Sequence, residues 1–149
     1  MLEFREAELR SDLLLYMVSR CRGTAKAAAD SGEAIAAQAL SMFYGSYSPK
    51  FYNRTGNLTS SYSRYYKDNG SVVYGGVRIH SDNMSEYTHG SYSSHKVASI
   101  TWLNGAHGWE NITTPPYLIA SANFISLLPS FDMAGIQFAH SQGYSVLQF

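Results

Sequence analysis

The side chains best suited to chemistry in this chain are its five histidines. Imidazole is a common zinc ligand and can carry a proton at neutral pH. Zinc ligands usually recur at short spacing, as in HExxH, and no two of these histidines have such spacing. Because Cys21 is the only cysteine, a second thiolate ligand is missing as well. The sequence therefore predicts no metal site and no cofactor at the histidines, which are His80, His89, His95, His107 and His140.

Other catalytic patterns are equally weak. Serine is abundant, but the chain has no GxSxG elbow to expose a nucleophile. The glycines of residues 74–76 and 105–108 lack the strand, loop and helix context of a phosphate-binding loop. The carboxylates are few and scattered, so paired acid–base chemistry has little support. We predict that the protein is not an enzyme, and a hydrolase that uses a histidine remains only as a third alternative.

A set of aromatic residues is the better candidate for a binding role. Such rings can stack on sugars or bases, or they can fill a protein interface. The formal net charge is zero, with 11 basic and 11 acidic residues, which disfavours nucleic acid as the main partner. A protein interface is the first interpretation, and a small carbohydrate-binding module that uses Tyr92, Trp102 and Trp109 is the alternative. The candidate interface residues are Tyr87, Tyr92, Trp102, Trp109 and Tyr117.

Composition favours one domain with a surface made for protein contacts. The chain has 149 residues, enough for a single core. Only 15% of the residues are charged, whereas Tyr and Gly each occur 12 times, and interfaces prefer Tyr to Lys and Glu. The longest apolar run, residues 13–18, is far shorter than a membrane span. Acidic residues near the start contradict a signal peptide, so we expect a soluble, unsecreted protein without disulfides.

Helical spacing dominates the first third of the chain. A first amphipathic helix is predicted over residues 3–22, ended by Gly23, with an apolar stripe at Leu9, Leu13, Leu14, Met17, Val18 and Cys21. An Ala-rich second helix is predicted over residues 24–47. Asp30 and Glu33 would form a capping box if it starts anew near Gly32, whereas a continuous helix would carry Gly32 at a cost of about 1 kcal/mol. Both alternatives are compatible with the sequence.

Strand patterns follow the helices. Period-two character runs from Leu58 to Tyr66, and Asn69-Gly70 predicts a hairpin turn. In residues 71–80 the apolar parity shifts across Gly75-Gly76, which predicts a β-bulge. Residues 81–96 are predicted to form a long loop and 97–103 a strand. A third helix should begin at Pro115, capped by Thr114 and closed by Pro129, and a non-periodic docking tail should occupy residues 129–149.

The segment 47–61, which follows an Ala-rich helix, resembles the tail-completion or head-to-tail joining family of tailed bacteriophages. That family has a long helix, a turn with Pro and then Thr-Gly-X-Leu and Ser, a bent sheet, and a later Pro-Pro that opens a helix. Pro115 and Pro116, before Tyr117, match the later signature, and the likeness covers residues 24–128. The turn residues are Pro49, Arg54, Thr55, Gly56, Leu58 and Ser61.

The resemblance implies a fold and a role. The fold is α+β, with helices on one face of a bent, mainly antiparallel sheet and with a long projecting loop. The single domain comprises an N-terminal helix (1–22), a family-like core (24–128) and a C-terminal docking tail (129–149). The expected role is a structural subunit of the virion, assembled in the host cytoplasm. It would form a homo-oligomeric ring, a hexamer, at the head–tail interface, as a tail-completion protein, a tail terminator or a neck connector, with head connector and tail tube proteins as neighbours. The genome would pass through this ring without sequence-specific recognition, and no membrane would be involved.

Overall fold

A computed structural model describes residues 2–46, 48, 56–84, 93–105 and 114–144, with side chains from residue 7 onward. In this part of the chain the elements are α1 (Leu2–Gly45), the 3-10 helix η1 (Asn57–Ser60), β1 (Tyr62–Asp68), β2 (Val73–Ile79), α2 (Ser94–Asn104), α3 (Pro116–Ser126) and α4 (Leu128–Ser141). The fold class is α+β as expected, because the helices pack against a two-stranded antiparallel sheet.

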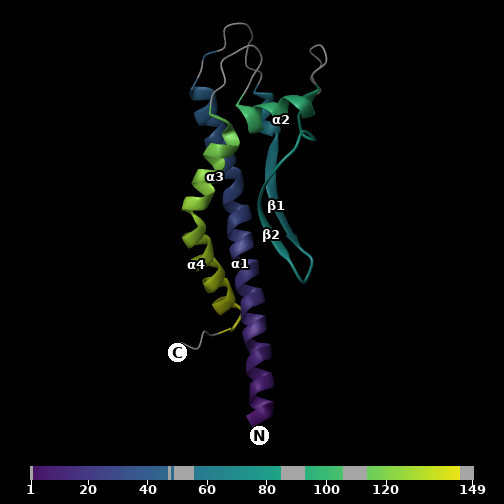
Figure 1. Cartoon of the computed structure of the whole chain (residues 1–149), viewed down its shortest axis with the longest axis vertical. Helices are drawn as coiled ribbons and strands as arrows, with labels where there is room; N and C mark the ends of the chain where they lie inside the picture. Colours follow the sequence, from purple (N-terminus) through teal and green to yellow (C-terminus); the bar gives the residue numbers. More distant parts are fainter. Residues whose placement is uncertain (1, 47, 49–55, 85–92, 106–113, 145–149) are drawn as a thin grey trace.

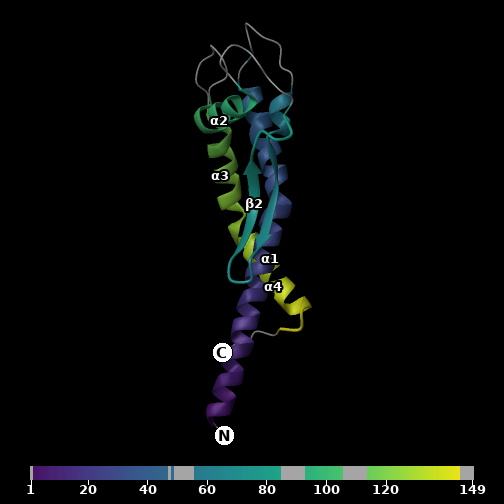
Figure 2. The same cartoon turned by 90° about the vertical axis from the view of Figure 1, so that its right-hand side faces the viewer.

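One helix, α1, is the axis of the molecule. Its 44 residues correspond to a rod about 66 Å long at 1.5 Å per residue. Figure 1 shows α3 and α4 along one side of this rod and the hairpin along another, while the N-terminal part of α1 extends alone past the other described elements. Figure 2 shows the same extension after a quarter turn. The predicted break at Gly23 is wrong, and the continuous-helix alternative at Gly32 is correct.

Gly23 lies inside α1, and its lack of a side chain lets α4 pack very close to this helix. A Cβ atom at Gly23 would stand 2.5 Å from Cβ of Phe138 and 2.9 Å from Cα of Gly135, so the two helices touch almost backbone to backbone. Beside this contact, Arg20 donates two hydrogen bonds of 2.6 Å from one nitrogen to both carboxylate oxygens of Asp132. The close approach and the ion pair fix the register of α4 on α1.

The hairpin packs on α1 through its own glycines. Every residue from Tyr62 to Asp68 pairs with one residue of β2, so the predicted bulge at Gly75-Gly76 is wrong. A Cβ atom at Gly75 would overlap the backbone of Ala25, and one at Gly32 would stand 2.9 Å from the carbonyl carbon of Gly76. The glycine pair is therefore a helix contact. The predicted Asn69-Gly70 turn is confirmed, with the amide of Asn69 bonded to the carbonyl of Val72 and Gly70 at a φ of 83°.

Residues 97–103 form part of helix α2 and not the predicted strand. Ser93 caps this helix, its hydroxyl accepting a hydrogen bond from the amide of Lys96. The helix begins at Ser94, within the segment 81–96 that was expected to be a loop; the middle of that segment, residues 85–92, lies outside the described residues. The buried positions Ala98, Thr101 and Trp102 follow helical spacing, so the apparent alternation of Ile100 and Trp102 was too short to identify a strand.

The predicted third helix is present, but Pro129 does not close the helical region. Helix α3 begins at Pro116, one residue later than expected, and ends at Ser126. Pro129 then stands in the first turn of α4, where its missing N–H is harmless. The segment predicted as a non-periodic tail is thus largely a helix packed along α1, and residues 145–149 lie outside the described part.

Candidate assembly surface

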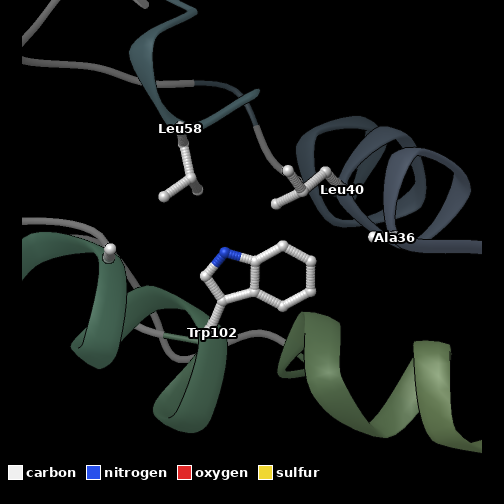
Figure 3. Packing of buried hydrophobic residues seen from close by; sticks show 5 residues of the cluster. Ala36, Leu40, Leu58 and Trp102 are labelled. Carbon is white, nitrogen blue, oxygen red and sulfur yellow. The ribbon is translucent and has the colours of Figure 1, made fainter. Parts of the chain in front are cut away.

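The turn that carries the family resemblance contributes to the core cluster formed by α1, η1 and α2. Gly56 adopts the left-handed conformation with a φ of 73° just before η1, and Leu58 and Ser61 are buried. The side chain of Leu58 packs with Leu40 and Trp102 (Figure 3). This agrees with the predicted permissive backbone at Gly56 and the tucked position of Leu58. Three further residues of the turn, Pro49, Arg54 and Thr55, lie outside the described residues.

A buried hydrogen-bond chain joins this turn to α2. The indole N–H of Trp102 donates to Oγ of Ser61 at 2.7 Å, and Oγ of Ser61 donates to the carbonyl oxygen of Leu58 at 2.5 Å. Because the Ser61 hydroxyl both accepts and donates, the polar atom of Trp102 is satisfied inside an apolar cluster. These two hydrogen bonds therefore fix α2 against the turn.

Only part of the predicted aromatic interface is at the surface. Trp102 is 2% exposed, so its assignment to an interface or a sugar site is wrong. Tyr117 is exposed on α3 as expected, whereas Tyr87, Tyr92 and Trp109 lie outside the described residues. The carbohydrate-binding alternative thus loses the one proposed stacking ring that the structure describes.

Each histidine that the structure describes has its own neighbouring side chain. Nε2 of His80 is 2.9 Å from Oγ of Ser63, and Nδ1 of His95 is 3.4 Å from Oγ of Ser81. The ring of His140 lies beside that of Tyr16, with centroids 6.5 Å apart. Among the described residues, no group of three His, Cys, Asp or Glu side chains could hold a metal ion. His89 and His107 lie outside them.

The strongest surface feature is the uncovered N-terminal part of α1. We call it the bare segment, and its five large apolar side chains are between 48% and 63% exposed: Leu9, Leu13, Leu14, Leu15 and Met17. Successive leucines at 13, 14 and 15 point in different directions around a helix, so one packed neighbour cannot cover them all. The sequence predicted a core stripe here. The leucine run itself was the available signal that the apolar side chains here do not form a single stripe.

The outer face of the hairpin is a second unusual surface. Residues alternate between the faces of a strand. Tyr62 and Val77 pack into the core, so the opposite parity faces away from α1. We call this opposite set the hairpin face. It holds two exposed aromatic rings, two cations and no acid, and its large exposed residues are Tyr65, Lys67, Tyr74 and Arg78.

Ion pairs anchor the inner side of the hairpin to α1. Arg64 lies 2.6 Å from a carboxylate oxygen of Asp30, and Nε of Arg22 donates to Asp68 at 2.8 Å. The backbone N–H of Gly70 also donates to Asp68, and this bond with the Arg22 contact holds the pKa of Asp68 below its ordinary value. Burial raises the pKa of Tyr62, at the other end of β1. The hairpin is thereby fixed with its outer face turned away from its own α1.

Further apolar side chains lie exposed on the last two helices and on the residue between them, at Tyr117, Leu118, Ile125, Leu127, Leu128 and Met133. No charged residue occurs in α3. No single described helix is long and apolar enough to cross a membrane; α3 and α4 reach that length and apolarity only as a pair bent by 51°. Both helices pack along α1 (Figure 1).

Comparisons with protein-family models, curated proteins and solved structures give no match. The function is therefore inferred from the motif and from the surfaces described above.

Proposed function

We propose that this chain is a structural, non-enzymatic subunit of a tailed-bacteriophage particle, forming a homo-oligomeric ring at the joint between head and tail. The observation that carries the proposal is the bare segment, where α1 leaves the rest of the fold with apolar side chains on several sides. Large apolar side chains exposed on several sides of one helix are normally covered by neighbours. The turn motif, with Gly56 in the left-handed conformation and Leu58 buried, adds support from the resemblance.

The size of the bare segment favours a ring over a simple pair. Full burial of a Leu or Met side chain contributes about 1.5–3 kcal/mol, so covering five half-exposed ones contributes roughly 4–8 kcal/mol. Association itself costs about 4–15 kcal/mol. The free energy gained by burial at one such contact is thus about equal to the cost of association. A closed ring gives every subunit two contacts, so it assembles where an isolated pair would not.

The proposed place in the particle follows from the family resemblance. The ring would be a hexamer that contacts the head connector on one side and the tail tube on the other, and it would let the genome pass. It needs no cofactor and no membrane, and it is assembled in the host cytoplasm before it joins the virion.

The test is the mass of the purified protein over a concentration series, together with negative-stain imaging. Rings with a central opening are expected. The variant Leu13→Ser should shift the assembly to higher concentration because it removes apolar area from the bare segment. Leu103→Ser is the matched control, since Leu13 and Leu103 are both 59% exposed and Leu103 lies on α2.

Two results would count against the proposal. One is a chain that stays monomeric at every concentration and also fails to bind isolated phage connectors or tails. The other is an equal effect of Leu13→Ser and Leu103→Ser on assembly, which would remove the special role of the bare segment.

A further inference from the structure

We propose that neighbouring subunits of the ring join through the hairpin face of one copy and the bare segment of the next. The inference rests on the proposed function and names the partner surface of the same site. Its occupant is a second copy of this chain, chosen by the chemistry of the two surfaces and by where the fold leaves each of them.

The bare segment continues a face of α1 that is covered further along. Leu9, Tyr16 and Gly23 stand seven residues apart, so they lie on one side of the helix. On that side Tyr16 lies against His140 of α4 and Gly23 against Phe138. Helix α4 ends at Ser141. At Leu9 this face of α1 is no longer covered by α4, so another element can pack there in the position that α4 occupies further along the helix.

This continued face carries negative charge beside its leucines. Glu8 and Asp12 stand one turn apart and flank Leu9 and Leu13. Both acids are exposed, and neither forms an ion pair within the described residues. A partner for this surface needs apolar area together with cations.

The hairpin face has this complementary composition. Tyr65 and Tyr74 supply half-exposed rings, and the described residues provide no ion-pair partner for Lys67 or Arg78. Lys67 lies directly opposite Tyr74 in the sheet, so Arg78 is four residues further along β2, or about 13 Å. Glu8 and Asp12 are about 6 Å apart along α1. Glu8 and Asp12 of one copy can thus lie between Lys67 and Arg78 of the next. The rings of Tyr65 and Tyr74 then pack on the leucines of the bare segment.

The chain's own hairpin cannot make this contact. It is held on the middle of α1 by the Arg22–Asp68 and Arg64–Asp30 ion pairs, and its hairpin face points away from that helix. The chain's own residues 145–149 contain no charged side chain, so they do not match the acids. Two different surfaces on each copy give a head-to-tail contact, which is the type that closes rings.

Charge reversal tests the contact. The hairpin variant carries Lys67→Glu and Arg78→Glu, and the helix variant carries Glu8→Lys and Asp12→Lys. Each variant alone should associate at least about tenfold more weakly than the unchanged chain, because attraction becomes repulsion at every interface. Mixed one to one, the two should assemble again, since each reversed surface then meets an oppositely charged one. Lys26→Glu with Lys96→Glu, which changes the net charge as the hairpin variant does but on other surfaces, should leave assembly unchanged.

The outcomes separate this contact from the proposed function. Rings from both reversal variants would overturn the contact and leave the ring subunit standing, whereas no assembly by the unchanged chain, even on isolated connectors or tails, would overturn both. Loss of assembly in the hairpin variant alone would also overturn the contact and would point to another partner of the basic face, such as nucleic acid. If the helix variant lowered the melting temperature of the monomer and mixing restored nothing, residues 145–149 would be the occupant and the contact would be wrong.

Discussion

Gly135→Ala should destabilise the protein although alanine is the better helix former. Alanine gains about 0.8–1 kcal/mol of helix propensity over glycine. Against this gain, the new Cβ atom would overlap Oγ1 of Thr24 and stand 2.6 Å from the carbonyl oxygen of Arg20. A side chain could turn away, but the backbone of α1 cannot, so α4 must move outward. Overpacking of this kind costs about 1–3 kcal/mol and sometimes more.

Because the clash is with backbone atoms, the cost lies near the upper end, about 3 kcal/mol, and the net loss is roughly 2 kcal/mol. This corresponds to a melting temperature lower by roughly 4–8 °C for a chain of this size. The assay is urea and thermal unfolding at a concentration where the chain is monomeric. Gly45→Ala is the control, because a Cβ at the end of α1 meets nothing within 4 Å, and its stability should be unchanged or raised by up to about 1 kcal/mol. Equal or greater stability of Gly135→Ala than of the unchanged chain would refute the close-contact explanation.

Two further predictions concern the core around Trp102 and the hairpin. Ser61→Ala should lower the free energy of unfolding by about 1–3 kcal/mol because the buried N–H of Trp102 loses its acceptor. A double-mutant cycle with Trp102→Phe, measured by urea unfolding, should show positive coupling. Additive losses in this cycle would contradict the hydrogen bond. The pKa of Asp68 is lowered in the folded chain, so its contribution to stability is complete above the unfolded pKa of about 3.9 and is lost as the pH falls through the lower folded value. Asp68→Asn should remove this part of the acid dependence in unfolding measurements between pH 5 and pH 2, and an unchanged pH profile would show that the Gly70 and Arg22 contacts do not act on it.

The parts of the fold that were predictable have local causes. The Asn69-Gly70 turn needs a residue with positive φ, and Gly70 has one. Likewise Gly56 stands in the left-handed region before Leu58 enters the core. The helix from Pro116 starts where a proline is harmless. In each case the residue type and its immediate neighbours determine the backbone.

Two of the errors share one physical origin, which is that glycine serves either as a break or as a contact. Gly23 was interpreted as a helix end and Gly75 as part of a bulge, yet each lies where another backbone approaches. That neighbour, Gly135 or Ala25, is distant in the sequence, so no local pattern distinguishes the two uses. The exposure of the bare segment was hidden for the same reason, because an apolar stripe indicates burial without showing where α4 ends.

The pairing of α1 with α4 also has a consequence during synthesis on the ribosome. Arg20 and Asp132 are separated by 112 residues, which take about 6–22 s to translate at 5–20 residues per second. Throughout that interval the first helix has emerged while its closest partner does not yet exist, and the leucines of the bare segment stay uncovered even afterwards. Nascent chains on neighbouring ribosomes of one messenger RNA thus expose this apolar helix to each other before α4 has been synthesised. We expect a chaperone that binds residues 9–17 during synthesis to protect such a chain from aggregation.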